Sequence, residues 1–129
     1  MQPTEDDRMR VLITAIMPVY NGVEFIEKSL PPLVEMCQRG EIHEVIVVDD
    51  GSTDGTALAA GQLGARVIQS GGRLGPGGAR NRAAQTATGD ILWFVDADVV
   101  VHADAAVALH QGFENNKIVG VFGSYDDNP

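Results

Sequence analysis

The chain has 129 residues, which is enough for one compact domain with one hydrophobic core. Hydrophobic residues make up 44% of it, so the composition excludes wholesale disorder. Eighteen acidic and nine basic residues give a formal net charge of −9, which disfavours binding to nucleic acid or to an anionic membrane. The single cysteine, Cys37, excludes an internal disulfide and a cysteine-rich zinc site.

The start of the chain shows no targeting signal. Residues 1–9 are polar and acidic, without the charged-then-apolar order of a signal peptide, and we expect a flexible tail there. The longest early apolar run, Val11 to Val19, is far shorter than the roughly 20 residues of a membrane helix. We therefore expect a cytoplasmic chain with no membrane segment of its own, an expectation that leaves open membrane association of a longer protein.

Five short apolar runs are spaced regularly along the chain. Each run is apolar at nearly every position, which is typical of strands covered on both faces, as in a parallel sheet. In chain order, the predicted strands are residues 11–17, 44–48, 65–69, 91–95 and 117–122. We expect Pro18 to end the first strand, because proline lacks the N–H that a ladder of backbone hydrogen bonds uses.

Segments with capping residues and glycine stops lie between these runs. The predicted helices are residues 21–39, 53–63, 78–86 and 103–114. We expect Asn21 to cap the first helix, and Pro31-Pro32 to kink it or divide it into two. Strands that alternate with helices in this way predict an α/β fold, an open and mostly parallel sheet with helices on both faces.

Polar residues gather where three of the predicted strands end. They are Pro18, Val19 and Tyr20 after the first strand, Asp49 and Asp50 after the second, and Asp96 and Asp98 after the fourth. The carboxyl ends of parallel strands share one edge of an open α/β sheet, and ligands bind in the crevice there. A polar loop is the simpler interpretation of any one cluster, but three clusters at one edge predict a single site.

Asp96 and Asp98 are two residues apart at the end of a strongly apolar run. An extended backbone places both carboxylates on the same side of the sheet, where they repel each other unless a cation lies between them. Mg²⁺ or Mn²⁺ suits such a pair, because these ions prefer oxygen ligands. The alternative is a pair of solvated turn aspartates.

Other residues at this edge suit a nucleotide. A carboxylate at Asp49 or Asp50 accepts hydrogen bonds from the N–H or hydroxyl groups of a ligand, and Tyr20 offers a flat face to a base, with loop anchoring as its alternative role. Residues 55–89 contain no acidic residue but four arginines. This local positive charge is suited to a diphosphate, and Arg80 is the arginine we favour for that contact.

Four motifs stand in order along the chain: IMPVYNG at 16–22, VVDDGSTDGT at 47–56, GARN at 78–81 and FVDAD at 94–98. In this order they resemble the motifs of family 2 glycosyltransferases with the GT-A fold. The resemblance covers residues 10–125, which we expect to form a GT-A-like donor-binding domain, with residues 126–129 as a C-terminal tail.

The resemblance implies a Rossmann-like α/β/α sandwich that binds a UDP- or GDP-linked sugar. The residues expected to contact the donor nucleotide are Pro18, Val19, Tyr20, Asp49, Asp50, Arg80 and Asp96. Asp96 and Asp98 correspond to the D-x-D motif that holds Mg²⁺ or Mn²⁺ against the donor diphosphate. An acceptor hydroxyl, deprotonated by a carboxylate base, then attacks the anomeric carbon with inversion.

The sequence departs from the family pattern after the fifth predicted strand. Family members normally continue with an acceptor-binding half that carries the catalytic base, and no residue after Asp98 is a convincing base. We therefore expect a donor-binding fragment that is weak or inactive as a transferase on its own. We also expect the exposed edge where the acceptor half would dock to favour self-association.

Three alternatives use the same acidic residues. A non-catalytic nucleotide-sugar-binding module shares the whole pocket and is the nearest of them. A phosphatase of the haloacid dehalogenase class would use Asp96 as nucleophile and Asp98 as acid and base, but it needs this motif on an early strand. A phosphate-receiver domain needs its acidic pair after the first strand, whereas here the pair Asp49-Asp50 follows the second.

Overall fold

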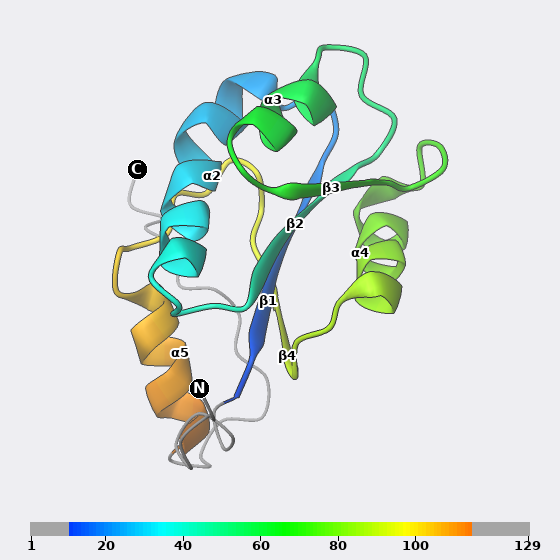
Figure 1. The fold of residues 1–129 in the computed structure, drawn as a ribbon. Coiled ribbons are helices and arrows are strands. Elements are labelled where there is room, and N and C mark those ends of the chain that lie inside the picture. The colour runs from blue at the N-terminus through cyan, green and yellow to red at the C-terminus, as the bar shows by residue number, and fades with distance from the viewer. Residues whose placement is uncertain (1–10, 115–129) are drawn as a thin grey trace, which may run out of the picture.

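The structure is a computed structural model that describes residues 11–114, and it contains one parallel sheet with helices packed on both sides (Figure 1). The strands are β1 (Ile13–Val19), β2 (Glu44–Asp49), β3 (Arg66–Gln69) and β4 (Ile91–Phe94). They are arranged in the order β3-β2-β1-β4, so β3 and β4 are the outer strands of the described sheet. The helices are α2 (Val23–Gln38), α3 (Thr56–Gln62), α4 (Gly75–Thr86) and α5 (Ala105–Glu114).

The helices divide unequally between the two faces. Helices α2, α3 and α5 cover one face and α4 covers the other (Figure 1). The larger core includes Met17, Leu30, Leu33, Val47 and Trp93, and the smaller one consists of Ile16, Ile46, Val48, Ala79 and Ala83. Apolar side chains from both sides of β1 are therefore buried, which confirms the predicted α/β fold and explains why the strand sequences do not alternate.

The prediction that Pro18 ends the first strand is wrong, because β1 continues to Val19. β1 pairs with β4 only as far as Ile16, and with β2 through Val19. The carbonyl of Ile16 accepts a hydrogen bond from Val95 N, so the nitrogen of Pro18, two residues on, points to the same side. β4 has ended at that level, and the missing N–H of Pro18 therefore costs no ladder hydrogen bond.

Pro31-Pro32 does not divide the helix into two, since α2 is continuous over 16 residues. Its buried face is formed by Ile26, Leu30, Leu33 and Met36, each fully buried in the larger core. Packing of this apolar face supplies more stability than the two prolines remove, because most helical stability in proteins comes from tertiary contacts.

The other helix boundaries shift by a few residues. α3 begins at Thr56 after Gly55, later than predicted, and α5 begins at Ala105. α4 begins at Gly75, three residues before the predicted start, with Pro76 in its first turn, where a proline needs no N–H partner. The predicted strand 117–122 and both predicted tails lie outside the described residues. No helix between residues 11 and 114 combines the length and apolarity needed to cross a bilayer.

Candidate functional site

A cavity of about 270 Å³ opens at the carboxyl ends of the strands. All the predicted site residues except Asp49 line it: Pro18, Val19, Tyr20, Asp50, Arg80, Asp96 and Asp98. They come from the end of β1, the end of β2, helix α4 and the segment after β4. The structure thus brings together at one edge the residues that the sequence placed in separate clusters.

Asp49 and Asp50 lie side by side in the chain but face different surroundings. Both side chains are buried, and Asp49 does not line the cavity. Its carboxylate accepts hydrogen bonds from Ser52 N at 3.0 Å and from Gln69 Nε2 at 3.0 Å, which hold the end of β2 against β3 and the following turn. Asp50 is therefore the member of the pair that a ligand in the cavity meets.

Asp50 is held in place by the loop between β3 and α4. It accepts hydrogen bonds from Ser70 Oγ at 2.6 Å, Leu74 N at 2.8 Å and Gly75 N at 2.8 Å, and Arg73 Nη1 lies 3.4 Å away. Burial acts to raise the pKa of Asp50, but these hydrogen bonds and the Arg73 charge outweigh it and hold the pKa below its ordinary value. The carboxylate is thus ionised and fixed before any ligand arrives.

Tyr20 lies on the loop between β1 and α2, and this loop is fastened to the loop after β2. Asn21 N donates to Ser52 Oγ at 2.9 Å, and Asn21 Oδ1 accepts from Thr53 N at 2.8 Å. Asn21 has a positive φ of 48° and does not cap α2, contrary to prediction; the cap position is Gly22, without a side-chain hydrogen bond. The fastening fixes Tyr20, 46% exposed, at the mouth of the cavity.

Arg80 and the D-x-D pair form the charged side of the cavity. Arg80 Nη2 lies 3.5 Å from Asp96 Oδ1, and the Arg80 guanidinium lies 5.9 Å from the centre of the Phe94 ring. Arg80 Nε is buried and has no hydrogen-bond partner within the described part of the chain. A buried donor without a partner is costly, so the site is suited to an acceptor that a ligand would bring.

The donor set at this edge fits a divalent cation. Asp96 and Asp98 are both exposed and both line the cavity. Among residues 11–114, no cluster of three or more histidine, cysteine, aspartate or glutamate side chains could hold a metal ion. Two carboxylates with an open surface match the way Mg²⁺ is held in nucleotide sites, through one or two carboxylates with waters and substrate phosphates.

Two residues that line the cavity, Phe25 and Arg73, were not among the predicted site residues. Phe25, in the first turn of α2, is 53% exposed and lines the cavity. The sequence could have indicated its exposure, because Phe25 precedes the apolar stripe that begins at Ile26 and is not part of that stripe. Arg73 belonged to the predicted group of arginines, but its guanidinium lies over the Tyr20 ring at 3.7 Å, a contact that no spacing indicates.

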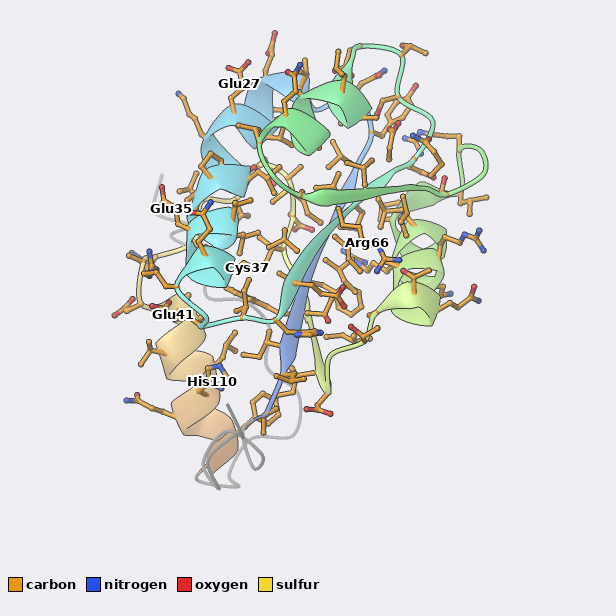
Figure 2. All side chains as sticks on the ribbon, in the orientation of Figure 1. Glu27, Glu35, Cys37, Glu41, Arg66 and His110 are labelled. Carbon is orange, nitrogen blue, oxygen red and sulfur yellow. The ribbon has the colours of Figure 1, made fainter. Side chains whose placement is uncertain are left out.

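Two further ionisable residues, His110 and Arg66, do not line the cavity. His110 on α5 is half-buried, and its Nε2 lies 2.7 Å from the carbonyl oxygen of Glu41; both residues are labelled in Figure 2. Arg66 on β3 is largely exposed and pairs with Glu44 at 3.5 Å. These residues hold elements together and are not part of the candidate site.

The comparison with known families decides the class of protein. The model described as "Glycosyl transferase family 2" matches residues 14–129. The chain belongs to glycosyl transferase family 2. This membership removes the phosphatase and receiver-domain alternatives.

Relatives in glycosyl transferase family 2 are much longer than this chain. It is 32% identical over 114 residues to a poly(ribitol-phosphate) beta-glucosyltransferase of Bacillus spizizenii, an alignment that covers 81% of the chain and 18% of that protein. It is 35% identical over 98 residues to glucosyl-3-phosphoglycerate synthase of Mycobacterium tuberculosis, covering 68% and 29% respectively. The chain therefore spans less than a third of the length of either relative.

Solved structures of glycosyltransferases share the fold. Glucosyl-3-phosphoglycerate synthase of Mycobacterium tuberculosis, in complex with Mn²⁺, UDP-glucose and phosphoglyceric acid, matches with a TM-score of 0.73 and 29% identity over 83% of this chain and 40% of that one. The mannosyltransferase PcManGT of Pyrobaculum calidifontis, in complex with GDP-Man and Mn²⁺, matches with a TM-score of 0.71 and 33% identity over 80% and 32%. These matches confirm the GT-A, Rossmann-like class of the fold.

Proposed function

We propose that this chain binds a nucleotide-diphospho-sugar together with Mg²⁺ or Mn²⁺, as the donor-binding part of an inverting glycosyltransferase. The observation that carries the proposal is the cavity that gathers Tyr20, Asp50, Arg80, Asp96 and Asp98 at one edge of the sheet. The two solved relatives described above hold Mn²⁺ with a UDP-sugar in one case and a GDP-sugar in the other. We therefore propose UDP- or GDP-linked sugars as the donor class.

Each part of the cavity has a role in this proposal. Tyr20 contacts the base, and Asp50 accepts a hydrogen bond from the base or ribose, after a change of partners at its carboxylate. Arg80 contacts the diphosphate, which provides the acceptor that its buried Nε lacks. Asp96 and Asp98 hold the cation, which when bound supplies positive charge to the diphosphate leaving group.

Activation of the acceptor hydroxyl requires a further carboxylate. Within residues 11–114, the acidic side chains that line the cavity are Asp50, Asp96 and Asp98, and all three have roles in holding the donor. We propose that the catalytic base lies outside these residues. The described part then binds the donor and contributes no base of its own.

Calorimetric titration with UDP and with GDP, each with and without Mn²⁺, tests the donor site. We expect nucleotide binding to require Mn²⁺ and to fall at least tenfold in Asp98→Asn, because this variant replaces a charged metal ligand by a neutral amide of similar size. Asp104→Asn is the matched control, since Asp104 is exposed, precedes α5 and does not line the cavity. Binding of equal strength in Asp98→Asn and the parent chain would contradict the proposed metal site.

A non-catalytic nucleotide-sugar-binding module is the second candidate, favoured by the lack of a base among the described cavity residues. The two functions differ in what happens to a bound donor. Slow release of sugar from UDP-glucose or GDP-mannose, dependent on Mn²⁺ and lost in Asp98→Asn, would support the transferase. Tight binding with an intact donor after prolonged incubation would support the module.

A further inference from the structure

One face of the Tyr20 ring is already occupied by another side chain of the cavity. The guanidinium carbon of Arg73 lies 3.7 Å from the centre of the Tyr20 ring, and both residues line the cavity. This is the separation of two stacked layers in direct contact. A nucleobase inserted between them would need a separation of about 7 Å, twice one layer.

We propose that Arg73 occupies the nucleobase position in the empty protein and that the base displaces it from Tyr20 on binding. Arg73 thereby sets the affinity of the site for every nucleotide. The inference rests on the proposed function, since it assumes that a base stacks on Tyr20.

The contacts of Arg73 allow it to leave without disturbing the site. Its side chain is 53% exposed, and besides the Tyr20 ring it contacts Asp50 at 3.4 Å, the longest of the four contacts to that carboxylate. Ser70 Oγ and the amides of Leu74 and Gly75 hold Asp50 without it. The guanidinium can therefore swing into solvent while the carboxylate stays in place.

The backbone around Arg73 is also suited to such a change. Gly71 and Gly75 adopt φ values of 98° and 84°, in the left-handed region that glycine enters without strain. A Cβ at either glycine would meet no atom within 4 Å, so space is open beside these two positions. The exposed side chain of Arg73 can therefore move while the backbone amides of Leu74 and Gly75 keep their hydrogen bonds to Asp50.

The competition predicts that weakening the stack tightens nucleotide binding. Arg73→Lys keeps the positive charge beside a diphosphate but lacks the planar group that stacks on a ring. We expect UDP, in the presence of Mn²⁺, to bind about two- to fivefold more tightly to Arg73→Lys than to the parent chain, which corresponds to the loss of one exposed cation–π contact. Arg82→Lys is the matched control, because Arg82 is exposed and lies on α4 outside the cavity.

A second variant separates stacking from charge. Arg73→Met keeps an apolar stem and removes both the charge and the planar group, so it is titrated with uridine, which carries no phosphate. We expect uridine also to bind more tightly to Arg73→Met than to the parent chain. Equal or weaker binding of UDP to Arg73→Lys, together with equal or weaker binding of uridine to Arg73→Met, overturns the proposal and shows that Arg73 assists binding.

The stack itself is measured in the free protein by NMR. Ring currents should shift the Arg73 side-chain protons upfield, and this shift should vanish in Tyr20→Leu and on addition of UDP with Mn²⁺. Absence of the upfield shift in the free chain overturns the proposal. If the folded parent chain and all variants bind neither UDP nor GDP with Mn²⁺, the proposed function itself is wrong. If they bind but Arg73→Lys does not bind more tightly, only the displacement of Arg73 is contradicted.

Discussion

Asp54 Oδ2 accepts a hydrogen bond at 3.2 Å from the backbone nitrogen of Val23, a residue 31 positions earlier in the chain. Val23 is the first residue of α2, and the other oxygen of Asp54 accepts from the backbone nitrogen and the hydroxyl of Thr56 at the start of α3. One carboxylate therefore satisfies the free amides of two helices. It also ties the loop that carries Tyr20 to the loop that follows Asp50.

Replacement of Asp54 should affect both stability and nucleotide binding. In Asp54→Ala the first turn of α2 loses its side-chain acceptor, so we expect the thermal midpoint to fall by a few degrees. UDP binding should weaken as well, because Tyr20 is no longer held relative to Asp50. Glu27→Ala, at an exposed position of α2 outside the cavity, is the control in both measurements. An Asp54→Ala variant that binds UDP as the parent does would show that the tie does not position Tyr20.

The pH dependence of stability follows from carboxylates whose pKa values are lowered in the folded chain. For Glu44, burial raises the pKa, but hydrogen bonds from Thr88 N, Thr14 Oγ1 and Thr88 Oγ1 outweigh it. The pKa of Asp50 is lowered too. A lowered folded pKa gives stability that is complete above the unfolded value of about 4 and is lost as the pH falls through the folded pKa.

Urea unfolding at pH 7, 5, 4 and 3 measures this effect. We expect the free energy of unfolding to be nearly constant from pH 7 to 5 and to fall below pH 4. Glu44→Gln should reduce that fall and lower stability at pH 7 by about 1–2 kcal/mol, because its charged hydrogen bonds are lost. Glu27→Gln, on the exposed side of α2 (Figure 2), should change neither the fall at low pH nor the stability at pH 7. A free energy of unfolding that stays constant down to pH 3 would contradict the lowered pKa values of Glu44 and Asp50.

We expect Arg80 to contribute more to nucleotide binding than to the stability of the fold. Its contact with Asp96 is long and exposed, so Arg80→Ala should leave the free energy of unfolding nearly unchanged. Its loss should weaken UDP binding in the presence of Mn²⁺ by ten- to a hundredfold, the usual range for a charged hydrogen bond of roughly 1.5–3 kcal/mol. Calorimetry beside Arg82→Ala checks this, and a similar loss in both variants would point to general electrostatic attraction instead.

Replacement of Gly89 and of Gly77 by alanine should change stability in opposite directions. A Cβ at Gly89 would lie 2.5 Å from Thr14 Oγ1 and 2.9 Å from the carbonyl oxygen of Leu12, so Gly89→Ala should destabilise the chain by about 1–3 kcal/mol. Gly77, within α4, has no atom within 4 Å of such a Cβ, and Gly77→Ala should stabilise by about 0.5–1 kcal/mol. Denaturant unfolding of both variants tests this, and destabilisation by Gly77→Ala would contradict the described α4.

Much of the fold and the site follows from local rules of sequence. Continuous apolar runs predict buried parallel strands, and polar residues at three strand ends predict one edge site, because parallel strands end together. Those rules place Tyr20, Asp50 and Asp96 in a common cavity, as the structure shows.

The remaining features depend on partners far away in the chain. Pro18 continues a strand only because β4 ends two residues earlier, and Asp49 is withdrawn from the cavity by Gln69, 20 residues later. The contact of Arg73 with Tyr20 joins two loops whose approach depends on the whole sheet. Propensity and spacing carry no information about such contacts, so no motif predicts them.

The unequal covering of the two faces has a consequence for how the protein responds to a ligand. The buried side chains of α4 are those of two alanines, Ala79 and Ala83, whereas α2 buries four large side chains. Local unfolding of α4 should therefore cost less free energy than that of α2, so its amides should exchange with solvent sooner. Arg80 and the Gly75 amide that holds Asp50 both belong to α4. On binding, a nucleotide that contacts them should order α4 further, so slower hydrogen exchange should extend over residues 75–86.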